Sequence, residues 1–159
     1  MSSEKMKEVE AILYQRGLKL LEDNSRKIIE KIKTTIIDLV HNPDVRLSLK
    51  LSAYLVKELG KDYNYLSRLF SSVENMTIER YLISQKIERA KELLVYDEIT
   101  LSEIANHLDY SSVQHLSSQF RKITGMSPPH FRKTFIISEN TTGLSSQLLN
   151  YSTLESIFF

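Results

Sequence analysis

Two clusters of polar side chains, 50 residues apart, contain the residues whose types and spacing suggest chemistry. The arginine of the first cluster carries a planar guanidinium, which can bond O6 and N7 of a guanine together, and glutamine can pair with adenine in the same two-point way. Serine hydroxyls bond more weakly and with less selectivity. The chemistry that these groups suggest is hydrogen-bonded recognition, and helical spacing leaves Asn64, Ser67, Arg68 and Ser71 outward in the first cluster and Gln114, His115, Ser118 and Arg121 outward in the second.

The sequence offers little for catalysis or metal binding. It has no cysteine, and its four histidines do not have the spacing of zinc ligands. It has no glycine loop to cradle a phosphate, no nucleophile elbow and no pair of carboxylates placed for acid–base work. We therefore expect neither an enzyme nor a resident metal or cofactor.

The composition is that of a helical globular protein. The 159 residues are 42% hydrophobic and 26% charged, with only four glycines and three prolines, a balance that favours helices over a turn-rich β fold. The polar residues 1–5 do not resemble a signal peptide, and no apolar run approaches the roughly 20 residues that span a bilayer. We expect an all-α, cytoplasmic protein, and the absence of cysteine fits a reducing compartment.

The charged residues are unevenly distributed along the chain. The net charge of +1 is too small to indicate nucleic acid by itself. No acidic residue lies between Asp109 and Glu139, however, and this window holds Arg121, Lys122, Arg132 and Lys133. Such a window also fits a solvated basic face, so it favours an anionic partner only in combination with the pattern around it.

An internal repeat places the two polar clusters on equivalent helices. Apolar residues recur at a constant separation of 50 residues in the pairs Leu66/Leu116, Phe70/Phe120, Val73/Ile123, Met76/Met126 and Tyr81/Phe131. Their spacing along each copy is that of a helix that buries one face. Two copies of one supersecondary unit are the expected cause.

A shorter amphipathic helix precedes each copy. Before the second copy, Thr100 and Glu103 form a capping-box pattern, and Ser111 or Ser112 can cap the helix that follows. Before the first, Gly60 can supply the turn. The buried faces of these shorter helices are expected to hold Leu51, Tyr54, Leu55 and Leu59, then Leu101, Ile104, Ala105 and Leu108. Each unit therefore has the pattern of a helix-turn-helix, although two helical hairpins that only pack a core would share it.

A single helix is expected between the units, over residues 77–96, with Thr77 as its cap. At about 1.5 Å per residue, about 18 helical residues span roughly 27 Å. Successive major-groove faces of a duplex lie about 34 Å apart. A stiff connector of this length could let one chain place two helices in adjacent major-groove segments.

These segments resemble the DNA-binding domain of the AraC/XylS family of bacterial transcription regulators, over about residues 47–135. Asp109 stands where the family usually has glycine at the turn, and Phe131 replaces a more usual tyrosine. The resemblance is carried by residues 65–70, 86–94 and 101–105, by Tyr110, Leu116 and Phe120, and by residues 125–132.

The resemblance implies two helix-turn-helix subdomains joined by a long linker helix, double-stranded DNA as partner, and recruitment of RNA polymerase by an activator. The family's base-reading positions map onto Asn64, Ser67 and Arg68 in the first unit and onto Gln114, His115 and Ser118 in the second. Phosphate contacts set register and affinity rather than sequence; they are expected from Ser71, Ser111, Arg121, Lys122, Arg132 and Lys133. The alternative is a helical module that binds protein partners and no nucleic acid.

The two ends of the chain lie outside the region that resembles the family. Residues 4–22 and 26–41 are expected to form two helices around residues 23–25. The second would pack on the first subdomain; the first would cover the core as a lid, the interpretation we favour, or contact a sensory domain or a second copy. We expect an extension over residues 1–40, the DNA-binding domain over 41–135 and a polar tail over 136–159. The roughly 40 residues before the DNA-binding domain are too few for an effector-binding domain, so we expect either a small stand-alone regulator or a piece of a longer protein.

Overall fold

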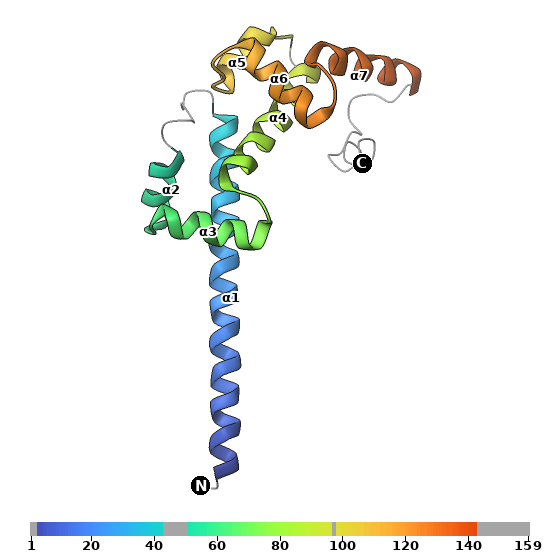
Figure 1. Cartoon of the computed structure of the whole chain (residues 1–159). Coiled ribbons are helices and arrows are strands. Elements are labelled where there is room, and N and C mark those ends of the chain that lie inside the picture. Colours follow the sequence, from blue (N-terminus) through green and yellow to red (C-terminus); the bar gives the residue numbers. More distant parts are fainter. Residues whose placement is uncertain (1–2, 43–50, 97, 143–159) are drawn as a thin grey trace. The chain divides into compact units, whose positions relative to one another are not determined.

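The computed structural model describes residues 3–42, 51–96 and 98–142. Every regular element in these ranges is an α-helix, as the composition predicted (Figure 1). The elements are α1 (Ser3–His41), α2 (Leu51–Leu59), α3 (Tyr63–Glu74), α4 (Ile78–Tyr96), α5 (Leu101–His107), α6 (Val113–Thr124) and α7 (Pro128–Thr142).

The chain divides into two compact units. Among the described residues, the first unit comprises 3–38 and 51–81, and the second comprises 39–42, 82–96 and 98–142. In each unit a short helix packs against a longer one, α2 against α3 and α5 against α6. The α4 helix contributes its first residues, through Tyr81, to the first unit and the rest to the second. The predicted pair of helix-turn-helix units is therefore present.

The repeat seen in the sequence is also a repeat in geometry. Both longer helices, α3 and α6, have 12 residues. Asp62 and Ser112 cap their N-termini by accepting hydrogen bonds from the backbone N–H groups of Asn64 and His115. Both helices end at a left-handed residue, Asn75 at φ 55° and Gly125 at φ 79°. Each cap is 50 residues from its equivalent, so the two units begin and end these helices in the same register.

Each unit has its own buried core. In the first unit the buried side chains include Ile29, Ile32, Ile36, Leu55, Leu66, Phe70 and Ile78. In the second they include Ile87, Leu93, Ile104, Leu108, Leu116, Phe120 and Phe131. The ring of Phe70 meets Tyr81 edge-on at 5.5 Å, and the ring of Phe120 meets Phe131 in the same way at 5.5 Å. The repeated aromatic pairs therefore close both cores, and Phe131 packs there without a tyrosine hydroxyl.

The local signals for turns and caps are confirmed. Thr100 and Glu103 form the capping box, and Thr77 accepts a hydrogen bond from the N–H of Arg80 at the start of α4. Gly60 and Asp109 both have positive φ, 60° and 54°. Aspartate tolerates this conformation better than most residues, so the turn forms at Asp109 without the family's glycine.

One pair in the repeat does not lie where the pattern predicted. Val73 and Ile123 were expected in the buried faces, but they are 50% and 47% exposed. Each is one residue before the end of its helix, where few core side chains remain to cover it. Tyr54 is also exposed, while Leu59 and Leu101 are only half-buried.

The prediction of two N-terminal helices is wrong. The α1 helix runs without a break from Ser3 to His41 (Figure 1). The residues at 23–25 cost only fractions of a kcal/mol each in a helix, whereas a break needs proline or a strong competing cap. The lid is wrong as well, because Met6, Val9, Ile12, Leu13 and Leu21 are all exposed.

The α7 helix extends into the segment that was predicted to be a polar tail. The α7 helix starts at Pro128, as expected for proline at a first helical position, and continues to Thr142. Residues 136–142 are thus helical, and Ile136 and Ile137 are exposed on that helix. The remainder of the predicted tail, residues 143–159, lies outside the described residues.

Replacing Gly125 with alanine is expected to destabilise the second unit by about 1–2 kcal/mol, because an L-residue at positive φ brings Cβ close to the backbone. No other atom lies within 4 Å of the added Cβ, so the cost is conformational. Thermal unfolding followed by circular dichroism measures it. Gly17→Ala is the matched control: this glycine lies inside α1 with open space around it, so alanine there should raise helicity and not lower the melting temperature.

Candidate nucleic-acid interface

Tyr110 anchors the second long helix within its unit. It is buried at 8% exposure, and its hydroxyl donates a hydrogen bond of 2.6 Å to Oε1 of Gln119 on α6. On the other side, Nζ of Lys86 on α4 lies 5.1 Å from the centre of its ring. Burial raises the pKa of Tyr110 to about 12, so the phenol keeps the proton that it donates at neutral pH. These contacts connect α6 with α4 through the turn.

The ammonium of Lys86 is itself in a buried position. Its pKa is lowered by burial, and the carboxylate of Asp109 opposes that shift. A cation over an aromatic ring is favoured most where water is excluded. The ring of Tyr110 and the charge of Asp109 therefore both compensate for the loss of hydration of Lys86.

An ion pair connects α3 with α1 in the first unit. Nζ of Lys33 lies 2.7 Å from Oε1 of Glu74 in the last turn of α3. The hydrogen bond with Glu74 raises the pKa of Lys33. Phe70 and Leu66 meanwhile bury the inner face of α3. The opposite face of α3 is thereby fixed toward solvent.

Most of the predicted base-reading residues lie on exposed faces. Asn64 and Arg68 are exposed on α3, and Gln114, His115 and Ser118 are exposed on α6. Ser67 is half-buried and offers less of its surface. The structure brings each set together on the first turns of its own helix. That is the part of a helix that enters a groove most readily.

The predicted phosphate-binding residues differ in their surroundings. Arg121, Lys122 and Lys133 are exposed, and no ion pair holds them within the part of the chain that the structure describes. Ser111 is also exposed, with its Oγ 3.1 Å from Nδ1 of His115. Ser71 is half-buried. The described part of the second unit therefore presents three cations without an ion pair, Arg121 and Lys122 on α6 and Lys133 on α7.

The comparisons with known proteins agree with this geometry. A family model described as a helix-turn-helix domain matches residues 55–134. The chain belongs to the AraC-type helix-turn-helix family. The matched region begins within α2 and ends within α7, so it contains both units' longer helices.

Two relatives match half and two thirds of this family member. The Msm operon regulatory protein of Streptococcus mutans is 29% identical over 79 residues, which are 50% of this chain and 28% of that protein. The C-terminal domain of AraT, a response regulator from Geobacillus stearothermophilus, has a TM-score of 0.57 and 26% identity, covering 67% of this chain and 84% of that one. The chain spans less than a third of the curated relative's length.

A third likeness concerns the fold alone. The DNA-binding domain of AdpA, a global transcriptional factor, was solved in complex with a target DNA. Its TM-score is 0.57 at 19% identity, over 74% of this chain and 97% of that one. The arrangement of helices is thus shared with a domain whose structure holds DNA.

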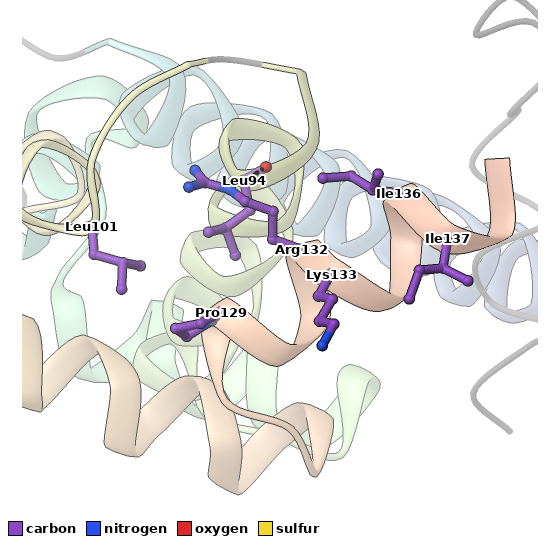
Figure 2. A pocket seen from close by; sticks show the side chains of 7 residues that line it. All are labelled: Leu94, Leu101, Pro129, Arg132, Lys133, Ile136 and Ile137. Carbon is purple, nitrogen blue, oxygen red and sulfur yellow. Dashed lines mark hydrogen bonds between the residues drawn. The ribbon is translucent and has the colours of Figure 1, made fainter. Parts of the chain in front are cut away.

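Arg132 has a role in this AraC-type chain that the sequence did not reveal. Its Nε donates a hydrogen bond of 2.8 Å to the carbonyl of Leu94, a residue that lies beside it in Figure 2. One Nη donates a hydrogen bond of 2.9 Å to the carbonyl of Ile99. These acceptors lie in the last turn of α4 and in the connection to α5. Arg132 therefore ties α7 to the preceding connection, and two of its donor groups are already engaged within the chain.

Arg132 also borders a shallow apolar groove in the second unit. The groove has a volume of about 310 Å³ and is lined by Leu94, Leu101, Pro129, Arg132, Lys133, Ile136 and Ile137 (Figure 2).

Within residues 3–42, 51–96 and 98–142, no group of three or more acidic or histidine side chains could hold a metal ion. None of the helices in the same ranges combines the length and hydropathy that a bilayer-spanning segment needs.

Replacing Arg132 with methionine is expected to destabilise the second unit by about 2 kcal/mol, because two partly buried carbonyls lose a charged donor. Lys133→Met is the matched control, since Lys133 is exposed on the same helix and its loss should change stability by less than about 0.5 kcal/mol. Urea denaturation measures both variants. Equal, small effects would show that the two internal hydrogen bonds contribute little to stability.

Proposed function

We propose that this chain is a sequence-specific DNA-binding regulator of transcription, with α3 and α6 as its two recognition helices. The observation that carries the proposal is the exposed polar face of α6, where Gln114, His115 and Ser118 lie on a helix that Leu116 and Phe120 bury from behind. The equivalent face of α3 presents Asn64 and Arg68, with Ser67 beside them. Side chains of these types read base edges in the major groove.

The basic residues of α6 and α7 support DNA rather than protein as the partner. Arg121, Lys122 and Lys133 are exposed cations in a window without a single acidic residue. In the proposed complex they contact phosphates, together with Ser71 and Ser111. Arg132 contributes the N–H groups that its two internal hydrogen bonds leave unused. Affinity should then fall steeply as salt concentration rises, since each phosphate contact releases counterions.

Regulation of transcription is proposed from the relatives. One of them is named as an operon regulatory protein, and the AdpA domain is named as that of a global transcriptional factor. The proposed role includes activation through contact with RNA polymerase. A reporter gene behind a bound site tests this: increased transcription supports an activator, and decreased transcription contradicts it.

The first half of α1 is proposed as the contact for a further domain or a second copy. Met6, Val9, Ile12 and Leu13 are exposed within two turns of one another, and an apolar cluster of this kind on a helix marks an interaction surface. Analytical ultracentrifugation distinguishes a second copy from a further domain as the partner. A mass that rises with concentration means a second copy, and a constant monomer mass leaves a further domain as the partner.

Selection from duplexes randomised over about 25 base pairs tests DNA binding directly. Two short conserved blocks with centres about 10 base pairs apart would mean that both units read one face of the duplex. A single block would mean that the second unit acts only on phosphates. No enrichment by a folded protein would refute DNA binding and favour a helical protein-interaction module.

A further inference from the structure

We infer that Tyr65 is a further DNA-contacting residue of the first unit, with its ring placed against the methyl group of a thymine. The inference rests on the proposed function, because it assigns a residue to the same recognition surface. It comes from comparing the two units in the register that their helix caps define. Tyr65 is absent from the base-reading set that the family resemblance implies.

The caps place Tyr65 and His115 at the same position. Asp62 caps α3 and Ser112 caps α6, so Tyr65 and His115 are each the third residue after the cap. Helix geometry fixes the direction of a side chain relative to the cap. Both side chains are exposed, Tyr65 at 45%. If His115 faces the groove, Tyr65 faces it as well.

Each ring is held by the residue four positions earlier. Nζ of Lys61 lies 5.9 Å from the ring centre of Tyr65, and Oγ of Ser111 lies 3.1 Å from Nδ1 of His115. Lys61 and Ser111 are again 50 residues apart, each in the turn before its helix. A side chain that is already held loses less conformational entropy when it binds. Both units therefore present a positioned ring at the start of the recognition helix.

The surroundings of Tyr65 suit a base pair rather than a protein core. Asn64 precedes it, and Arg68 follows one turn later; both are exposed. These polar groups would bond base edges on either side of the ring. An apolar surface in the major groove meets the thymine methyl, which no other base presents. Lys61 adds a positive charge that attracts the neighbouring phosphate.

The test uses the full chain and a duplex obtained from the selection described above. Dissociation constants are measured for the wild type, Tyr65→Ala and Tyr65→Phe, with thymine or deoxyuridine at each position of the first block. Deoxyuridine removes only the methyl group. At one position it should weaken wild-type binding about 4-fold, the value expected for one buried carbon. Tyr65→Ala should bind the thymine duplex at least as weakly as the wild type binds the deoxyuridine duplex, and deoxyuridine should not weaken its binding further. Tyr65→Phe should behave as the wild type.

Tyr54→Ala is the matched control, because Tyr54 is 41% exposed in the same unit but lies on α2; its affinity should not change. Wild-type affinity in Tyr65→Ala would overturn the inference, and so would equal losses in Tyr65→Ala and Tyr65→Phe without a deoxyuridine effect, which would assign the hydroxyl to a phosphate. Failure of the wild type to select any duplex would instead refute the proposed function.

Discussion

Replacing Phe120 with alanine is expected to lower the free energy of unfolding of the second unit by about 3–5 kcal/mol. Phe120 is fully buried, and its ring meets Phe131 edge-on at 5.5 Å. Alanine would remove both the apolar contact and the aromatic pair, and it would leave a cavity behind α6. Because a domain has only about 5–15 kcal/mol of stability in all, this variant should also lose the second unit's contribution to duplex binding.

Ile123→Ala is the control on the same helix. Ile123 is apolar but 47% exposed, so its truncation should change stability by less than about 0.5 kcal/mol. Urea denaturation followed by far-ultraviolet circular dichroism gives both values. A Phe120→Ala effect as small as that of Ile123→Ala would mean that the core of the second unit does not depend on its repeated aromatic pair.

Replacing Arg68 with alanine is expected to weaken binding to the selected duplex by about 5- to 150-fold, which corresponds to about 1–3 kcal/mol. Arg68 is exposed on α3, where a guanidinium can bond both acceptors of one guanine. The variant should also accept other bases at that single position. Competition binding with duplexes changed one position at a time measures both effects.

Two variants separate base reading from attraction by charge. Arg68→Lys keeps the charge but cannot form the planar two-point contact, so it should lose most of the base preference while keeping the salt dependence. Lys122→Ala should weaken binding to all duplexes alike and reduce the salt slope by about one. If Arg68→Ala weakens all duplexes uniformly, Arg68 contacts a phosphate and does not read a base.

The sequence by itself determined the features that depend on a few neighbouring residues. The repeat predicted two similar helical units, and both contain a helix of 12 residues with equivalent caps. The capping box at Thr100 and the left-handed turns at Gly60 and Asp109 are where local chemistry placed them. These features can be predicted from the sequence because a cap or a residue with positive φ involves only atoms a few residues apart. The exposed polar faces of α3 and α6 followed from helical periodicity in the same way.

The tertiary structure alone decided which side chains meet across the fold. Arg132 was predicted to contact phosphate, and no local pattern indicated that its guanidinium also reaches carbonyls 38 and 33 residues earlier in the chain. Val73 and Ile123 share the apolar pattern of the core, yet they lie beyond its edge. The uninterrupted α1 likewise reflects the small cost of polar residues within a helix. A periodic pattern shows which side of a helix is apolar, but burial and partner depend on which elements the complete fold brings against that side.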